Sequence, residues 1–440
     1  MAYRLHELGS TPTAWEAALV QVSKYTIAKP CLSGYELFNY GNDATRYIDK
    51  LTWDKLLESD FDGIEADLEE ELLLSGFLVE DDRSDVQNLL NRIDAEKSSK
   101  RRFQAIVFPT EKCNLRCTYC YEDFAIGKMP EAVQDQLVHF LKGKSEEYEE
   151  INVSWFGGEP LLALDVIDRV HRSLIPHLVR TRAGFSSQIT TNAYYLDAVR
   201  RRKLLALGVS AFQITLDGVR SDHNERRRMN PKSNLDKNTY DVILQNILAL
   251  ADEPDEFVCT IRFNYDKENI DGIKGCLADL GASLDQRFQF DFSPVWADPE
   301  QYPFEIFEGI ERHNSFISTN SHARECGVKT ANDKLHMFGG EVCYAANPHS
   351  IVVRSNGRLN KCTVALDLDA NQVGNLTSLG EADLDASLMN KWCDSGVKND
   401  KGCQSCWNAP SCQGDSCPLV RMTEQRRPCT ARKTSGTAII

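Results

Sequence analysis

Residues 113–120 read Cys-Asn-Leu-Arg-Cys-Thr-Tyr-Cys and directly follow an apolar, strand-like run. The cysteines are Cys113, Cys117 and Cys120, in a Cys-x3-Cys-x2-Cys spacing, and Tyr119 stands just before the third one. Three thiolates can hold three irons of a [4Fe–4S] cluster, which leaves the fourth iron open to bind and reduce another molecule. A zinc ion is the alternative, but it prefers a fourth Cys or His ligand, and none lies nearby in the sequence. The spacing therefore favours an iron–sulfur cluster.

The composition indicates a soluble protein of two or three domains. The chain has 440 residues and a net charge of −15. It has no apolar run of about 18 residues that would span a membrane, and its N-terminus lacks the apolar core of a signal peptide. We therefore expect a cytoplasmic protein with no membrane partner, whose fifteen cysteines bind metal rather than form disulfides. The negative charge argues against nucleic acid and favours a basic or neutral peptide partner.

The middle of the chain alternates between strand and helix patterns. The predicted strands are Phe103–Phe108, Ile151–Phe156, Ser187–Thr191, Ala211–Leu216, Phe257–Phe263 and Phe288–Phe292. The predicted helices are Glu131–Lys142, Leu164–Leu178, Asp197–Leu207, Tyr240–Leu250 and Ile270–Leu280. This alternation predicts an α/β fold with a parallel sheet and helices outside it. Short right-handed connections favour a curved sheet, a partial (β/α)6 TIM-like barrel.

Polar residues follow the predicted strands at their carboxyl ends, where barrel folds carry their active sites. Gly157, Gly158 and Glu159 follow the second strand, Asn192 follows the third, and Asp217 follows the fourth. The two glycines allow a ligand to approach the backbone closely. Glu159 and the neighbouring carbonyls can accept hydrogen bonds from an ammonium group. We expect these residues and the cysteine loop to form one site.

Together these motifs resemble the radical SAM superfamily, whose members have a partial (β/α)6 barrel. The resemblance implies S-adenosylmethionine as a cofactor, with Thr215 as the better ribose candidate and Asn192 as the second. The segment from His223 resembles the family's His-Asp-x-x-Arg, with Asn224 in place of Asp. It leaves open which of three consecutive arginines pairs with the cofactor carboxylate. The implied cofactor contacts are Tyr119, Gly157, Gly158, Glu159, Asn192, Thr215 and Arg227, the last chosen from Arg226, Arg227 and Arg228.

The C-terminal quarter carries a second set of cysteines. It reads Cys343-x13-Gly357-x4-Cys362, then Cys403-x2-Cys406-x5-Cys412-x4-Cys417, and finally Cys429. This resembles the SPASM domain, which holds two auxiliary [4Fe–4S] clusters, although the interval before Cys417 is one residue longer than usual. The resemblance implies one group of Cys343, Cys362 and Cys417, and another of Cys403, Cys406, Cys412 and Cys429. Either Cys326 completes the first group or that cluster keeps an open iron. A zinc ribbon is the alternative for Cys403 to Cys417.

The first 100 residues form a separate unit. Short strand patterns at Tyr25–Ile27, Tyr35–Asn39 and Ala44–Ile48 precede a helical pattern through Leu56–Leu74, a wing at Gly76–Val79 and a helix at Ser84–Ala95. This order resembles the winged-helix domain with which peptide-modifying radical SAM enzymes capture a leader peptide as an added strand. The expected domains are 1–100 for peptide recognition, 101–300 for the barrel, 301–340 as a bridge and 341–440 for the Cys-rich SPASM unit.

The resemblance implies an enzyme that cleaves S-adenosylmethionine to methionine and a 5′-deoxyadenosyl radical, which removes a hydrogen from a peptide. We expect three [4Fe–4S] clusters, a precursor peptide with a leader segment, and an electron donor such as flavodoxin or ferredoxin. The favoured reaction is a side-chain crosslink, either a thioether or a carbon–carbon bond. The alternatives are a sulfatase-type maturase that forms formylglycine and a metal-stapled peptide-binding protein without turnover. The catalytic acid or base is not predicted.

Overall fold

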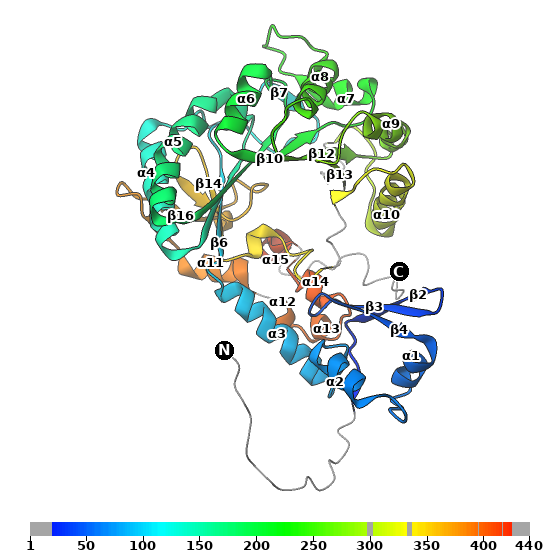
Figure 1. Ribbon diagram of the computed structural model, residues 1–440. Coiled ribbons are helices and arrows are strands. Elements are labelled where there is room, and N and C mark those ends of the chain that lie inside the picture. Colours follow the sequence, from blue (N-terminus) through cyan, green and yellow to red (C-terminus); the bar gives the residue numbers. More distant parts are fainter. Residues whose placement is uncertain (1–19, 297–301, 332–336, 395, 416, 425–440) are drawn as a thin grey trace.

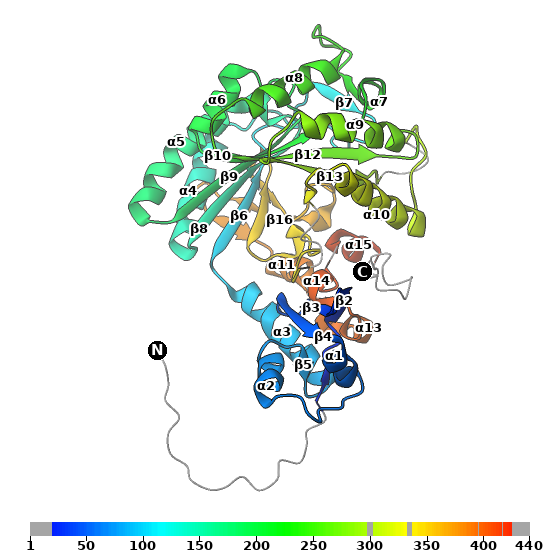
Figure 2. The ribbon, with the colours of Figure 1, turned by 45° about the vertical axis from the view of Figure 1, so that its right-hand side comes forward.

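The computed structural model describes residues 20–296, 302–331, 337–394, 396–415 and 417–424. The barrel-like part carries helices on its outer side, and the C-terminal elements lie between it and the N-terminal elements (Figures 1 and 2). Within the described residues, no helix is both long and apolar enough to cross a membrane.

A sheet of ten strands runs through the molecule in the order β13-β12-β10-β9-β8-β6-β14-β15-β16-β17. Its first six strands are parallel neighbours and form the predicted partial barrel. They are β6 (Arg102–Val107), β8 (Glu150–Trp155), β9 (Gly184–Thr191), β10 (Val209–Thr215), β12 (Val258–Tyr265) and β13 (Phe288–Pro294). Each overlaps its predicted range, so the fold class is confirmed.

The helices between these strands cover the outside of the sheet (Figure 1). Helix α5 shows why they form: Val166, Val170, Leu174 and Leu178 recur at helical spacing and are all buried. The helices are α4 (Glu131–Glu147), α5 (Leu164–Thr181), α6 (Ala198–Ala206), α8 (Thr239–Ala251), α9 (Ile270–Ala282) and α10 (Gly309–Glu325). The first five match the predicted helices, and α10 lies in the predicted bridge.

The C-terminal part continues the barrel sheet instead of forming a sheet of its own. Strand β14 (Ser350–Val353) lies parallel to β6, and β15 (Arg358–Asn360), β16 (Gln372–Leu376) and β17 (Ala382–Leu384) follow in antiparallel order. Sequence patterns gave no sign of this continuation. The remaining helices are α11 (Ala386–Cys393), α12 (Gly396–Asn399), α13 (Lys401–Gln404), α14 (Ala409–Cys412) and α15 (Pro418–Glu424).

The N-terminal unit has the predicted mixture of short strands and helices. Strands β2 (Thr26–Cys31), β3 (Gly34–Asn39) and β4 (Ala44–Asp49) form an antiparallel sheet, and β1 (Gln21–Val22) pairs with β5 (Leu78–Val79). Helix α3 (Asp82–Ser98) leads into the barrel. The helical pattern through Leu56–Leu74 is corrected: α1 (Lys50–Leu57) and α2 (Ala66–Leu74) are separate, with Ser59 and Gly63 at positive φ between them.

Candidate active site

The loop with the first three cysteines is fixed by a short strand pairing. Strand β7 (Leu115–Cys117) pairs antiparallel with β11 (Arg227–Met229), which follows helix α7 (Arg220–Arg226). The pairing sets Cys117 opposite Arg227, and the Thr118 N–H donates to the Arg226 carbonyl at 2.9 Å. The arginine segment that follows the fourth barrel strand therefore lies beside the cysteine loop that follows the first.

The three thiols of this loop lie close enough to affect one another. Burial raises the pKa of Cys113 and Cys117 and raises that of Cys120 to about 11, and the Cys117 thiol adds to the rise at its two neighbours. In the part of the chain with described positions, no three His, Cys, Asp or Glu side chains are arranged to hold a single metal ion. Three thiols of this kind fit a cluster, because bound iron keeps a coordinating thiol deprotonated.

The Tyr119 hydroxyl lies in a buried polar network. It donates to the Asp217 carboxylate and accepts hydrogen bonds from Arg227 Nη1 at 2.7 Å and from Asn264 Nδ2 at 3.1 Å. Asp217 is fully buried and also accepts from the Asn264 N–H at 2.9 Å. The sequence placed Asp217 at a strand end but gave it no role; its carboxylate links the cysteine loop to strands β10 and β12.

The structure separates the roles of the three arginines. Arg226 is buried in an ion pair with Asp266 at 2.8 Å, and Arg228 is exposed and donates to a backbone carbonyl. Arg227 is buried beside the cysteine loop and lines the adjoining cavity. Its Nε has no hydrogen-bond partner among the described residues. An unpaired buried donor of this kind fits a carboxylate ligand, and Arg227 is the one of the three arginines that lines the cavity.

The Gly157–Glu159 segment packs directly against the start of the cysteine loop. A Cβ at Gly157 would lie 2.5 Å from the Thr110 carbonyl oxygen, and Gly157 has a φ of +108°. A Cβ at Gly158 would lie 2.5 Å from the carbonyl oxygen of Lys112. The backbone of the cysteine loop lies too close to Gly157 and Gly158 for a side chain at either position. These glycines are therefore required whether or not a ligand binds.

The Glu159 carboxylate, predicted to accept from an ammonium group, already has hydrogen-bond donors within the protein. The Glu159 carboxylate is fully buried and accepts hydrogen bonds from the Leu161 N–H at 2.9 Å, the Thr191 hydroxyl at 2.7 Å and the Asn192 N–H at 2.8 Å. It thus ties the ends of β8 and β9 together. Among the other candidates, Asn192 Nδ2 lies 3.8 Å from Cys113 Sγ, and Thr215 lines the cavity.

One cavity joins this region to the C-terminal cysteines. Its volume is about 590 Å³, and its lining includes Tyr119 and Arg227 at one side and Cys343, Cys362 and Cys417 at the other. Burial raises the pKa of Cys343 to about 11, and the Cys362 and Cys417 thiols contribute to the rise. The predicted trio of C-terminal cysteines is therefore brought together, and it faces the same space as the predicted cofactor site.

Cys326 is not brought to this trio. It ends α10, and its Sγ lies 3.6 Å from the His322 ring on the same helix. The residues that follow Cys326 lie beside the amino-terminal half of β13, where the Phe290 N–H donates a hydrogen bond to the Lys329 carbonyl. The cavity lies at the other end of that strand, beside Ser293 and Pro294. Of the two predicted alternatives, this placement favours a Cys343 group without Cys326.

Two cysteines of the second predicted group pack against the N-terminal unit. Cys403 and Cys406 belong to an apolar cluster with Tyr25 and Ile93 of the N-terminal unit, and Cys412 ends α14. Cys429 lies outside the described residues.

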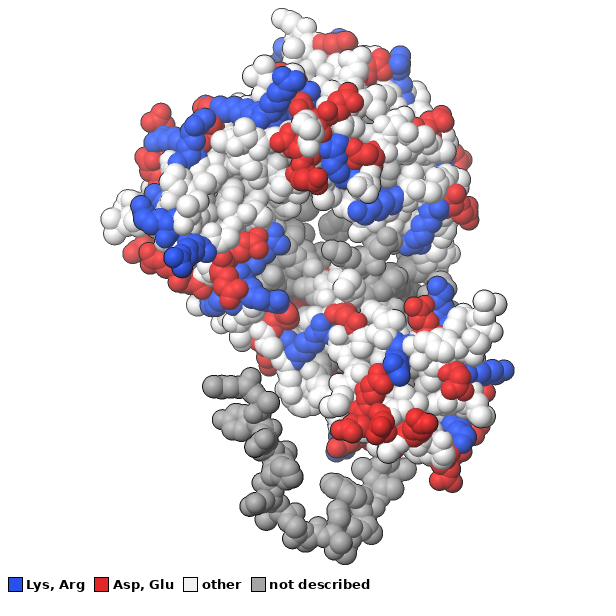
Figure 3. Space-filling model, in the orientation of Figure 1, with Lys and Arg blue, Asp and Glu red and all other residues white. Residues whose placement is uncertain are grey.

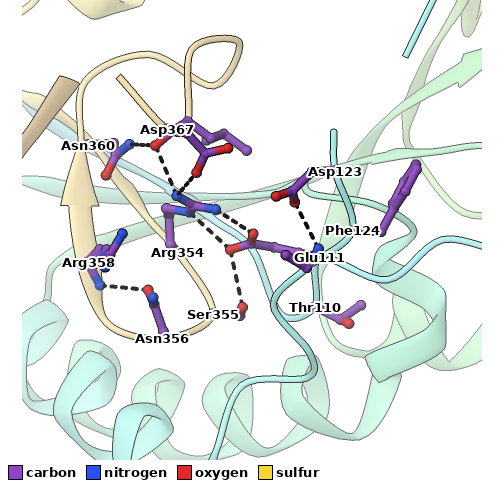
Figure 4. A network of polar contacts seen from close by, with 12 residues as sticks. Thr110, Glu111, Asp123, Phe124, Arg354, Ser355, Asn356, Arg358, Asn360 and Asp367 are labelled. Carbon is purple, nitrogen blue, oxygen red and sulfur yellow. Dashed lines mark hydrogen bonds and ion pairs between the residues drawn. The ribbon is translucent and has the colours of Figure 1, made fainter. Parts of the chain in front are cut away.

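A buried ion pair, which sequence reasoning missed, connects the cysteine loop to the C-terminal part (Figure 4). Arg354 binds Glu111 at 2.7 and 3.1 Å, and both side chains are buried. The Ser355 hydroxyl also donates to Glu111, at 3.2 Å. Burial raises the pKa of the nearby Glu122 to about 8. Glu111 is two residues before Cys113, so this network fixes the loop relative to strand β14.

Residues 107–280 match the model of the radical SAM superfamily. This chain carries a radical SAM domain. This superfamily implies S-adenosylmethionine and a [4Fe–4S] cluster as cofactors of the matched domain.

Similar proteins match parts of the chain. A GTP 3′,8-cyclase of Listeria monocytogenes is 28% identical over 172 residues, which is 36% of this chain and 49% of the cyclase. The structure of native anSMEcpe with bound AdoMet and Kp18Cys peptide has a TM-score of 0.54 and 17% identity over 71% of this chain and 88% of that one. Streptococcus suis SuiB bound to S-adenosylmethionine has a TM-score of 0.49 and 15% identity over 90% of this chain and 95% of that one.

Replacing Arg227 with lysine is expected to weaken S-adenosylmethionine binding by about 10- to 100-fold. Lysine keeps a positive charge opposite Asp217 but loses the fork that pairs with a carboxylate, and a hydrogen bond to a charged group contributes about 1.5–3 kcal/mol. Isothermal titration of the iron-loaded protein with S-adenosylmethionine gives the dissociation constant. Arg228→Lys is the matched control and should bind as the wild type does. Equal affinity of the two variants would contradict the assignment of Arg227.

Proposed function

We propose that this radical SAM enzyme modifies a ribosomally synthesised peptide by forming a side-chain crosslink, either a thioether or a carbon–carbon bond. Cys113, Cys117 and Cys120 would hold the cluster that, when loaded, reduces S-adenosylmethionine and supplies a 5′-deoxyadenosyl radical. The group of Cys343, Cys362 and Cys417 would hold an auxiliary cluster with an open iron, and Cys403, Cys406, Cys412 and Cys429 would hold a second one. An external protein such as flavodoxin or ferredoxin would donate the electrons.

The observation that carries this proposal is a cavity that adjoins the first cysteine loop through Tyr119 and Tyr121 and is also lined by the Cys343 trio. Tyr119 and Arg227 line it on one side, and the Cys343 trio lines it on the other. A peptide side chain in this space has the radical-forming site on one side and a thiolate-rich site on the other. An oxidative crosslink needs both features, because an electron leaves the substrate when the new bond forms.

The chain's own residues would bind and orient the reactants. The Arg227 guanidinium, held by the Tyr119 hydroxyl at 2.7 Å, would pair with the carboxylate of the cofactor. Thr215 would contact the ribose, and the backbone at Gly157 and Gly158 would approach the methionine moiety. The walls formed by Tyr121, Phe156 and Trp392 would exclude water from the radical.

The N-terminal unit supports a peptide substrate. Strands β2 and β4 are the edges of its sheet, and an edge strand can take an added peptide strand. Acidic side chains gather on this unit, at the lower right of Figure 3, and α2 alone carries Asp67, Glu69, Glu70 and Glu71. A leader segment rich in Lys or Arg would be attracted to such a surface.

The experiment uses the iron-loaded full chain with S-adenosylmethionine, dithionite and synthetic peptides encoded next to its gene. Each peptide is supplied with and without its leader segment. The expected product has lost two hydrogen atoms per crosslink, resists fragmentation between the joined residues, and forms only when the leader is present. Release of 5′-deoxyadenosine without change in any encoded peptide would contradict the proposal.

A second candidate is oxidation of a single Cys or Ser to formylglycine. The similarity to the structure of anSMEcpe with a bound peptide favours it, whereas the separate N-terminal unit favours a leader-dependent reaction. The two products are distinguished by an aldehyde-reactive hydrazide, which labels formylglycine and leaves a crosslinked peptide unlabelled.

A further inference from the structure

The N-terminal unit is packed onto the second group of C-terminal cysteines. Tyr25, Tyr40 and Ile93 share an apolar cluster with Cys403 and Ala409. The edges of this contact are polar: the Phe338 N–H donates to the Asp43 carboxylate at 2.8 Å, and Lys398 pairs with Asp94 at 2.5 Å. Both ribbon views place β3 beside α13 and α14 (Figures 1 and 2). The contact is therefore a built interface between distant parts of the sequence.

The Tyr25 hydroxyl is buried in this interface without a hydrogen-bond partner among the described residues. The side chain is 1% exposed, and its oxygen makes no hydrogen bond there. Asp85 is near, but its oxygens accept from the Ser23 hydroxyl at 2.8 and 2.9 Å and from the Lys24 N–H at 3.0 Å. An unpaired buried hydroxyl costs about 1–3 kcal/mol, so native proteins normally supply a partner.

The candidate partner of the Tyr25 hydroxyl is a cysteine sulfur in the same interface. Cys406 and Cys403 contact the same apolar cluster as the tyrosine ring. Sulfur atoms of an iron–sulfur cluster accept hydrogen bonds, and such bonds are one of the features that determine its reduction potential.

We propose that the Tyr25 hydroxyl donates a hydrogen bond to the cluster at Cys403, Cys406 and Cys412, through the Cys406 sulfur or an adjacent sulfide. This inference rests on the proposed function in one respect, that these cysteines hold a cluster. Tyr25 directly precedes edge strand β2 of the unit proposed to bind the leader. The unit that recognises the peptide is thereby a determinant of the reduction potential of an auxiliary cluster, and Tyr25 is a positioning residue of that cluster.

The test is Tyr25→Phe in the iron-loaded full chain, followed by a redox titration monitored by electron paramagnetic resonance. Phenylalanine keeps the ring packing and removes the donor. The midpoint potential of one cluster should become more negative, since the hydrogen bond stabilises the reduced, more negatively charged form. The other two clusters should keep their potentials, and the iron content should stay at about twelve per chain. Tyr35→Phe, whose ring packs on Trp53 within the same unit, is the control.

The outcomes separate the inference from the proposed function. Unchanged potentials for all three clusters in Tyr25→Phe would overturn the inference, as would the same shift in Tyr35→Phe, which would indicate a loosened unit. A wild-type iron content of about eight that is unaffected by Cys403→Ser/Cys406→Ser would instead overturn the proposed cluster. Both are supported if Tyr25→Phe, and not Tyr35→Phe, makes the potential of one cluster more negative. That cluster must also be the one that Cys403→Ser/Cys406→Ser removes.

Discussion

Replacing Cys113, Cys117 and Cys120 together with alanine is expected to abolish the release of 5′-deoxyadenosine from S-adenosylmethionine. The same change should lower the iron content from about twelve to about eight atoms per chain, since each cluster holds four irons. The reason is local: the three thiols lie close enough to affect one another and have no replacement ligand in the neighbouring sequence. Anaerobic iron and sulfide analysis and chromatography of the nucleoside product measure the two effects.

Cys259 provides the matched control for the triple variant. It is fully buried within the barrel core, away from the cysteine groups, and is expected to act as a small apolar residue. Cys259→Ala should keep both the iron content and the release of 5′-deoxyadenosine. Zinc in place of iron in the wild type, or an unchanged iron content in the triple variant, would contradict the cluster assignment.

Replacing Arg354 with alanine is expected to destabilise the protein by about 3–5 kcal/mol, because it leaves the buried Glu111 carboxylate without its cation. Arg354 makes two hydrogen bonds to that carboxylate and a third, at 2.9 Å, to the carbonyl of Leu366 (Figure 4). The cysteine loop begins two residues beyond Glu111, so the variant should also load the first cluster poorly. Urea unfolding monitored by circular dichroism measures the change in stability.

Arg358 lies on the same hairpin as Arg354 but is exposed. Arg358→Ala should change the free energy of unfolding by no more than about 0.5 kcal/mol, as is usual for surface substitutions. If the two variants lost the same stability, the buried pair would not be the link between the cysteine loop and strand β14.

The barrel was predictable because its signals are local. Each strand is a short apolar run and each helix has apolar residues at helical spacing, so ranges such as Leu164–Leu178 fell within the observed α5. The break between α1 and α2 was missed because a single Gly63 and a polar Ser59 interrupt a sequence that is otherwise rich in helix formers. The continuation of the sheet into β14 was missed because pairing partners are set by tertiary structure.

The candidate site was predictable in residue type but not in detail. Three consecutive arginines are visible in the sequence, but only their places, at the end of α7 and along β11, make Arg227 buried and Arg228 exposed. A count of cysteines suggested Cys326, yet its position at the end of an outer helix keeps it from the cavity. Glu111 and Arg354 are 243 residues apart, and nothing in either neighbourhood indicated the pair.

The measurement that tests the central claim most directly is the release of 5′-deoxyadenosine by the iron-loaded wild-type chain under anaerobic, reducing conditions. We expect S-adenosylmethionine to be converted to methionine and 5′-deoxyadenosine in equal amounts, and Cys113→Ala/Cys117→Ala/Cys120→Ala not to catalyse this conversion. An iron-loaded wild-type chain that leaves S-adenosylmethionine intact in the presence of dithionite would contradict it.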